Sequence, residues 1–199
     1  LLIVGELLYF RIADRCNIID KPNERSSHKG IILRGGGVIF LIGVWLYAAF
    51  FGWSYVWFML GLTAIGFISF ADDIWSVPNK YRLFVQFVAM FMMFWQLGII
   101  AIDSWWAVIV ALIIGVGIIN AYNFMDGING ITGGYSLAVL LPLIYINHQI
   151  SFIDSNLLYV IALSVLVFCW FNFRKRAKCF AGDVGSVSMA FIIQSRYSL

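Results

Sequence analysis

Long apolar runs recur along the whole chain, and they limit its fold more than any other feature does. The runs cover residues 1–13, 36–51, 55–71, 83–101, 105–122, 134–146 and 157–171, and another begins near Ser186. A helix needs roughly 20 apolar residues to span a bilayer. The runs do not alternate with period two, as strands of a membrane β-barrel do. They predict an all-α, polytopic integral membrane bundle of about seven to eight transmembrane helices.

Composition supports a membrane protein. Of the 199 residues, 62% are hydrophobic and 12% charged, whereas a soluble domain is about half apolar and about a quarter charged. The chain starts and ends inside apolar runs, so we expect a single transmembrane domain over residues 1–199 that is incomplete at both ends. The first run lacks the features of a cleavable signal peptide. The three cysteines show neither a disulfide framework nor a metal-ligand spacing.

The basic residues divide the loops into two sets. Loops 14–35, 72–82 and 172–186 contain lysines and arginines and fall on the same face as loop 123–133, whereas loops 52–54, 102–104 and 147–156 on the other face contain none. Cytoplasmic loops of membrane proteins carry this excess of positive charge. We therefore expect a multi-pass protein of the cytoplasmic (inner) membrane, with its polar loops facing the cytoplasm. Because these charges follow topology, they give no sign of a nucleic-acid partner.

The position of polar residues also bears on the class of function. A transporter more often has ionisable groups or broken helices in mid-membrane, but here the spans are almost free of charge. Glu6 alone lies inside an apolar run, either buried or near the end of its helix. The other polar clusters gather on one face, which favours an enzyme with one lipid and one soluble substrate. A non-enzymatic transporter of lipid-linked sugars remains the alternative.

Four polar clusters on that face could carry chemistry. Residues 20–38 combine cations, hydroxyls and a triple glycine, a set suited to phosphate or to a basic hinge. Asp72 and Asp73 could bind Mg²⁺ or act as a base; alternatively, Asp73 or Ser76 caps the next helix. Residues 120–130 place two asparagines on one helix face, followed by tight turns. Residues 170–186 end in a carboxylate between glycines, which suits a metal or phosphate site.

The order of these motifs carries a resemblance. RSSH and RGGG, then ADD after a span, then NxxNxxDGxxG, then FxGDxGS follow one another between residues 20 and 186. In this order they resemble the polyprenyl-phosphate N-acetylhexosamine-1-phosphate transferases of glycosyl transferase family 4, whose relatives include the phospho-N-acetylmuramoyl-pentapeptide transferases. The resemblance implies transfer of a sugar 1-phosphate from a UDP-N-acetylhexosamine to undecaprenyl phosphate, with release of UMP.

The resemblance also implies roles for individual residues. Asp183 matches the principal ligand of Mg²⁺, which Mn²⁺ could replace, and Asp72, Asp73 and Asp126 match catalytic aspartates. Asn129 stands where the family often has a second aspartate and can only hydrogen-bond there. The expected substrate-binding residues are Arg25, His28, Lys29, Asn123, Asn129, Asn172 and Phe180, with Phe180 stacking on uracil.

Several alternatives stay open. The lipid-linked product would start O-antigen or cell-surface polysaccharide synthesis, or the donor would be UDP-MurNAc-pentapeptide, as in peptidoglycan synthesis. The transfer would be a single in-line displacement or would pass through a covalent aspartyl intermediate. A CDP-alcohol phosphotransferase is excluded, because IN-GI follows Asp126-Gly127 where that class has DGxxAR. The family's His-rich motif has no counterpart here. The identity of the sugar and the oligomeric state, a homodimer included, are not determined.

Overall fold

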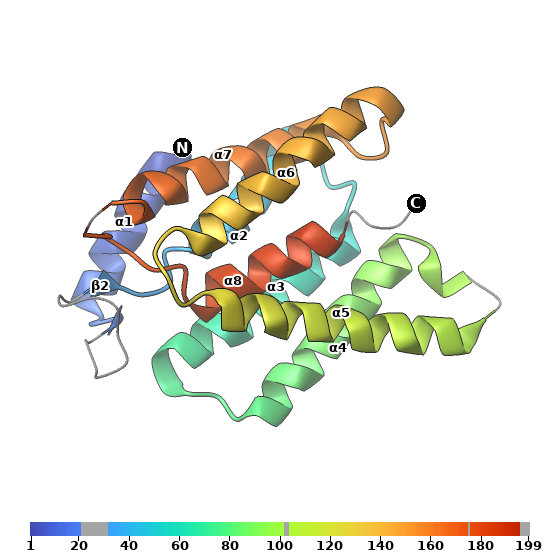
Figure 1. Ribbon diagram of the computed structural model, residues 1–199, viewed down its shortest axis with the longest axis horizontal. Helices are drawn as coiled ribbons and strands as arrows, with labels where there is room; N and C mark the ends of the chain where they lie inside the picture. The colour runs from blue at the N-terminus through green and yellow to red at the C-terminus, as the bar shows by residue number, and fades with distance from the viewer. Residues whose placement is uncertain (21–31, 102–103, 175, 196–199) are drawn as a thin grey trace.

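A computed structural model describes residues 1–20, 32–101, 104–174 and 176–195, which form eight α-helices (Figure 1). A short antiparallel pair, β1 (Ile19–Asp20) with β2 (Ile32–Leu33), follows the first helix, and a 3-10 turn, η1 (Ile99–Ala101), follows the fourth. The helices are α1 (Leu2–Arg15), α2 (Val38–Phe51), α3 (Val56–Trp75), α4 (Asn79–Gln96), α5 (Trp105–Met125), α6 (Ile131–Ile150), α7 (Ser155–Asn172) and α8 (Gly182–Gln194).

The predicted fold class is confirmed, since the described residues form a bundle of helices. Three of them, α3, α5 and α7, are long and apolar enough to cross a membrane, and α2 is a shorter apolar helix. Some helices extend beyond the apolar runs: α3 continues through Asp72 and Asp73, and α5 continues through Asn123. Hydropathy marks only the apolar part of a helix, so polar residues in a last turn were placed outside it.

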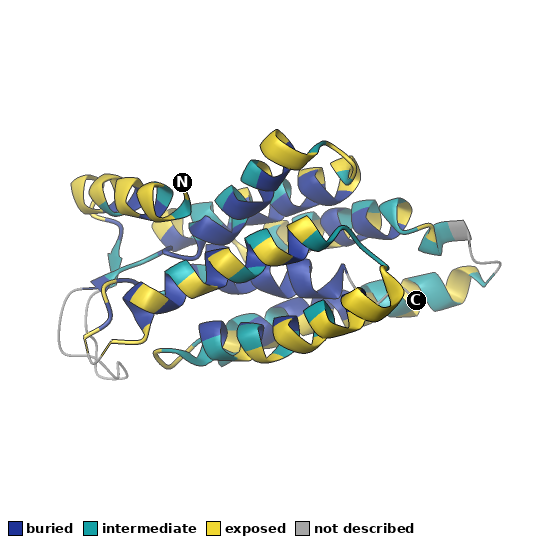
Figure 2. Ribbon diagram, turned by 90° about the horizontal axis from the view of Figure 1, so that it is seen from above, coloured by how far each residue is buried: buried dark blue, intermediate teal, exposed yellow. Residues whose placement is uncertain are grey.

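Helix α8 forms the centre of the bundle. It packs against α2, α3, α5 and α6, and Figure 1 shows it between the α6–α7 pair and the α4–α5 pair. Its residues from Val184 to Ile193 are all buried, whereas the outer helices carry many exposed residues (Figure 2). Large apolar residues are among those exposed. A buried central helix with an apolar periphery is the arrangement expected of a bundle surrounded by lipid.

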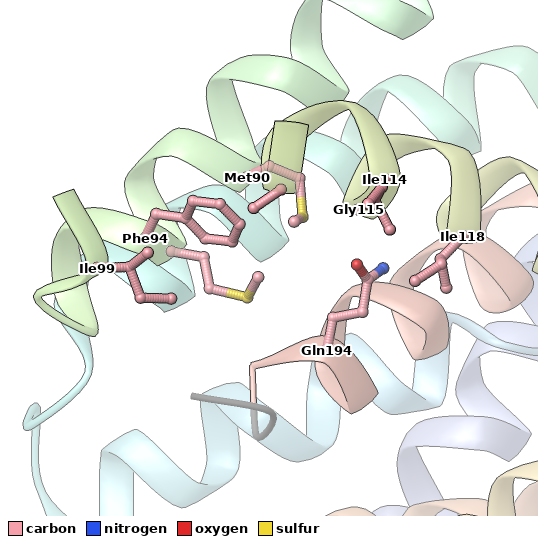
Figure 3. Close-up of a pocket in the computed structure, with 9 residues that line it drawn as sticks. Met90, Phe94, Ile99, Ile114, Gly115, Ile118 and Gln194 are labelled. Atoms are coloured by element: carbon pink, nitrogen blue, oxygen red, sulfur yellow. The ribbon is translucent and has the colours of Figure 1, made fainter. Parts of the chain in front are cut away.

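An apolar pocket of about 300 Å³ lies between α4, α5 and α8 (Figure 3). Met90 and Phe94 of α4 line it together with Gly115 and Ile118 of α5, and the amide of Gln194 from α8 faces it. These residues lie in the second half of α4 and at the last turn of α8, away from the polar loops. The pocket is therefore separate from the residues discussed next.

Candidate active site

Two non-helical segments, residues 33–37 and 178–181, lie side by side and build one wall of the polar end of the bundle. Leu33 N donates to Lys178 O at 3.3 Å, and Phe180 N donates to Leu33 O at 2.8 Å. Phe180 O then accepts from Gly36 N at 2.8 Å. We call these residues the paired segments. They bring Arg34, from the start of the chain, close to Asp183 at its end.

The glycines of the RGGG motif allow this pairing. Gly35 has a φ of +78°, and a Cβ on it would lie 2.4 Å from the Tyr9 hydroxyl, which donates to Arg34 O at 2.5 Å. A Cβ on Gly36 would lie 2.6 Å from Cys179 Sγ. The triple glycine is therefore required by close packing. Its predicted part in phosphate binding stays a prediction.

Gly37→Ala is expected to destabilise the protein, because its Cβ would lie 2.1 Å from the Cα of Gly185 in α8. Two backbones cannot separate without cost, and overpacking of this kind costs about 1–3 kcal/mol. Gly117→Ala is the matched control: nothing lies within 4 Å of its Cβ, and alanine favours a helix over glycine by roughly 0.5–1 kcal/mol. Thermal unfolding in detergent should show a lower Tm for the first variant and an unchanged or higher one for the second. A Gly37→Ala variant as stable as the wild type would contradict this packing.

Asp73 joins the end of α3 to the start of α8. Its carboxylate accepts hydrogen bonds from Asp183 N at 2.9 Å and Val184 N at 3.0 Å. The same carboxylate pairs with Arg34 Nε at 2.8 Å, and its side chain is 0% exposed. The first N–H groups of a helix have no partner within that helix, and here Asp73 supplies one. Asp73 is thus a cap, but of α8, 110 residues away, and not of the next helix.

Asp72 and Asp183 lie next to each other and share a cation. Arg82, from the first turn of α4, contacts Asp72 Oδ2 at 2.5 Å and Asp183 Oδ2 at 3.0 Å. Arg34 Nη2 lies 3.7 Å from Asp183 Oδ1. Burial raises the pKa of Asp183 to about 7, and the Asp72 side chain adds to this rise. Two adjoining carboxylates repel each other unless a positive charge lies between them, and Arg82 provides that charge.

Asn123 joins this cluster from α5. Its side chain lies 2.7 Å from Ser186 Oγ of α8. With the amide nitrogen turned toward Asp183, at 3.3 Å, the amide oxygen accepts from Arg82 Nη2 at 3.1 Å. Amide orientation is assigned from such a network, and this one satisfies both ends of the group. The structure therefore brings predicted residues from α3, α5 and α8 to one place.

A polar pocket of about 270 Å³ opens beside this cluster. Asn79, Arg82, Leu83, Asn120, Asn123 and Phe124 line it. Among these lining residues, Arg82 contacts the carboxylates of both Asp72 and Asp183, and Asn123 contacts that of Asp183. Asn120 lines the same pocket as Asn123 and also donates to Gln86 of α4 at 2.8 Å. The pocket and the carboxylate cluster therefore share Arg82 and Asn123.

Asp126 lies just beyond the end of α5. Its carboxylate accepts a short hydrogen bond from the Thr132 hydroxyl. Burial raises the pKa of Asp126 to about 6, an effect that the Thr132 bond opposes and that the negative charge of Asp73 strengthens. Asp126 therefore lies within electrostatic range of the cluster, but no direct contact joins it to Asp183 among the contacts of the described residues.

The raised pKa of Asp126 makes a prediction about stability. The folded protein holds this proton up to about pH 6, whereas the unfolded chain releases it near the ordinary aspartate pKa of 3.8. The free energy of unfolding should therefore fall by up to about 3 kcal/mol as pH rises from 4 to 7. Asp126→Asn lacks this loss, so its Tm should rise relative to the wild type over that interval. Parallel pH–Tm curves for the two proteins would contradict the assignment.

Asn129 and Asn172, two further predicted residues, lie at or next to another pocket. Asn172, at the end of α7, accepts from Gly130 N at 2.7 Å and donates to Cys179 O at 2.9 Å. It thereby ties the turn after α5 to the paired segments. Asn129 lines a pocket of about 600 Å³ together with Phe173. Phe180 lies on the paired segments, whereas Arg25, His28 and Lys29 lie outside the described residues.

The sequence patterns missed some residues that the structure places at the cluster. Arg82 was counted only among the basic residues of the loops, although it binds two of the aspartates. Arg34 was assigned to the phosphate-binding cluster with RGGG, and its pairing with Asp73 was not foreseen. Thr132 was not singled out. The available signal for Arg82 was its place after the ADD motif, since adjoining carboxylates require nearby cations.

A metal site built from three or more acidic, histidine or cysteine side chains is not present in the part of the chain that the structure describes. No group of three or more His, Cys, Asp or Glu residues there could hold an ion. The two adjoining carboxylates of Asp72 and Asp183 nevertheless fit Mg²⁺, because this ion often binds one or two carboxylates and takes its other ligands from water and substrate phosphates.

The fold and the cluster define a helical membrane protein with acidic and basic residues at one end, and comparison with known proteins gives its family. The sequence profile of glycosyl transferase family 4 matches residues 55–196. The chain belongs to glycosyl transferase family 4.

Individual relatives are similar over most of this chain. It is 28% identical over 202 residues to the undecaprenyl-phosphate alpha-N-acetylglucosaminyl 1-phosphate transferase of Yersinia pestis, covering 91% of this chain and 55% of that protein. It is 29% identical to a probable undecaprenyl-phosphate N-acetylglucosaminyl 1-phosphate transferase of Bacillus subtilis, covering 92% and 55%. It is 25% identical to the phospho-N-acetylmuramoyl-pentapeptide-transferase of Dictyoglomus thermophilum, covering 80% and 56%. The chain spans about half the length of these relatives.

Proposed function

We propose that the protein transfers an N-acetylhexosamine 1-phosphate from a UDP-sugar to undecaprenyl phosphate. The observation that carries the proposal is the pair of adjoining carboxylates, Asp72 and Asp183, with two arginines at one end of an apolar bundle. Membership of glycosyl transferase family 4 supports it. The apolar surface suits a lipid acceptor, and the polar end suits a soluble nucleotide sugar.

The transfer is a displacement at the β-phosphorus of the UDP-sugar. An oxygen of the lipid phosphate forms a new bond to this phosphorus, the bond to the bridging oxygen breaks, and UMP leaves with the electron pair. A phosphate monoester has a second pKa near ~6, so much of the acceptor is already a dianion at neutral pH. A general base contributes little to such a step, and Asp72 is more useful as a positioning group.

The residues of the cluster bind and orient the diphosphate. Mg²⁺ or Mn²⁺, held by Asp183 and Asp72, would supply neutralisation of the charge that develops on the phosphates. Arg82 and Arg34 already contact these carboxylates, and their remaining N–H groups can donate to phosphate oxygens. Phosphoryl transfer depends mainly on such positioning and charge stabilisation.

The proposal also covers the membrane location of the protein and the pathway that uses its product. The excess of basic residues in the loops at the polar end supports a cytoplasmic orientation of the cluster at the inner membrane. The lipid-linked product would start an O-antigen or another cell-surface polysaccharide. A second donor, UDP-MurNAc-pentapeptide, is favoured by the similarity to the D. thermophilum protein.

Release of UMP tests the proposal. The longest natural form of the protein, purified in detergent, is mixed with UDP-GlcNAc, undecaprenyl phosphate and Mg²⁺. We expect UMP release that requires both the lipid and the metal ion. UDP-MurNAc-pentapeptide and other UDP-N-acetyl sugars serve as alternative donors. Absence of UMP release with every one of these donors would contradict a transferase. It would support the transporter, which has no membrane gradient to act on in detergent.

A further inference from the structure

Glu6 has no role in the reaction just proposed, yet its surroundings are unusual. It lies in α1 and is 0% exposed. Its Oε2 atom has no hydrogen-bond partner among the described residues. Its Oε1 atom accepts from the thiol of Cys179, with an S–O distance of 3.7 Å. Buried polar groups are nearly always hydrogen-bonded, so a half-satisfied carboxyl calls for an explanation.

The position of Glu6 explains why a half-satisfied carboxyl is buried there. Cys179 belongs to the paired segments and bridges directly to Leu33. Glu6 Oε1 would lie only 3.2 Å from a Cβ on Gly36. Glu6 thus lies against both segments at the point where they meet. These segments carry Arg34 on one side and lead into Asp183 on the other, and those two side chains lie 3.7 Å apart.

The charge of Glu6 can be inferred from what surrounds it. None of the ion pairs found among the described residues includes Glu6. A buried carboxylate without a cation is very costly, so a carboxyl in this position is neutral. A neutral acid serves as a hydrogen-bonding group of fixed shape, and an amide of the same shape can replace it.

We propose that Glu6 is a positioning residue, which holds Cys179 and thereby fixes the paired segments so that Arg34 and Asp183 keep their relative placement. This inference rests on the proposed transferase function. It gives α1, which contributes no residue to the cluster itself, a part in the reaction. Tyr9, one turn later in α1, acts on the same segments through its bond to Arg34 O.

Three variants of the longest natural form test the proposal. Glu6→Leu removes the acceptor for Cys179 and should lower kcat/KM for the UDP-sugar at least about tenfold, the loss expected for one hydrogen bond of about 1.4 kcal/mol. Glu6→Gln keeps an acceptor oxygen and the neutral charge, and should stay within about threefold of the wild type. Ser188→Ala is the control. Ser188 Oγ is the other buried side-chain atom without a partner among the described residues, and its variant should match the wild type.

The outcomes separate positioning from simple stability. If Glu6 only stabilises the fold, Glu6→Leu lowers Tm and yield but leaves kcat/KM per folded molecule unchanged, and the proposal is wrong. A Glu6→Gln variant as impaired as Glu6→Leu would also overturn it, since the role would then need a charge. If the wild type itself releases no UMP, the proposed function fails before Glu6 is tested.

A double-mutant cycle gives a second measurement. Glu6→Leu and Cys179→Ala remove opposite partners of one contact. If Glu6 acts through Cys179, the two losses in kcat/KM should not add, and the double variant should resemble the worse single variant. Multiplied losses in the double variant would show that the two residues act independently, which contradicts the proposal. Where Glu6→Leu fails to fold, Cys179→Ala and Glu6→Gln still provide the test.

Discussion

Asp183→Asn is expected to lower lipid-dependent UMP release by about 10³-fold. Removing one group that stabilises a charged transition state costs about 10²–10³ in rate, and Asp183 is proposed to hold the metal ion as well. An amide keeps the shape of the side chain but carries no negative charge to bind Mg²⁺. The measurement is UMP release at saturating donor and acceptor, repeated at raised Mg²⁺ concentration.

The control for this variant is Asp14→Asn. Asp14 is an exposed carboxylate near the end of α1, outside the cluster, and its variant should keep the rate within about twofold, as is usual for surface substitutions. The Tm of Asp183→Asn should stay close to that of the wild type, because Arg82 keeps its pair with Asp72. An Asp183→Asn protein that retains more than about a tenth of the rate would contradict the metal site.

Asp73→Ala is expected to have the largest effect on stability. The change removes the acceptor of two helix N–H groups and leaves Arg34 only its longer contact with Asp183. Each buried N–H group left without an acceptor costs about 1–3 kcal/mol. The free energy of unfolding should fall by about the cost of these two groups, measured by denaturant or thermal unfolding in detergent.

Asp154→Ala provides a matched comparison for this change. Asp154 caps its own helix, α7, by accepting from Asn156 N at 2.9 Å, and losing such a local cap costs about 1 kcal/mol. Asp154 also accepts a hydrogen bond from the Tyr47 hydroxyl. Its replacement therefore removes two hydrogen bonds, which makes it a demanding comparison for the loss expected at Asp73. Equal losses for the two variants would mean that Asp73 contributes no more than an ordinary cap.

Much of the candidate site could be predicted, because its motifs lie at helix ends that an up-and-down bundle brings together. Helices α3, α5 and α7 end where α4, α6 and α8 begin, so Asp72, Asn123 and Asp183 had to lie at the same end of the bundle. The order of the motifs identified the family on the same residues. The placement of this end in the cytoplasm stays a prediction.

What could not be predicted is which partner each polar residue selects. Asn120 and Asn123 lie three apart on α5, share one face of that helix and line the same pocket. Because α5 packs against both α4 and α8, Asn120 nevertheless binds Gln86 of α4, whereas Asn123 lies against Ser186 of α8. Likewise, spacing does not reveal that Asp73 caps a helix distant in sequence, since that depends on how α3 and α8 pack.

The cap that Asp73 provides for α8 affects how this protein is synthesised. Its partner Val184 lies 111 residues further along the chain, and ribosomes add about 5–20 residues per second. Asp73 therefore leaves the ribosome about 6 to 22 s before the residues that bury it. Throughout that interval Asp73 has Arg34 as a partner but lacks the two helix N–H groups that it accepts from in the finished fold. The carboxylate cluster is completed by the last helix described, so partly synthesised chains lack it.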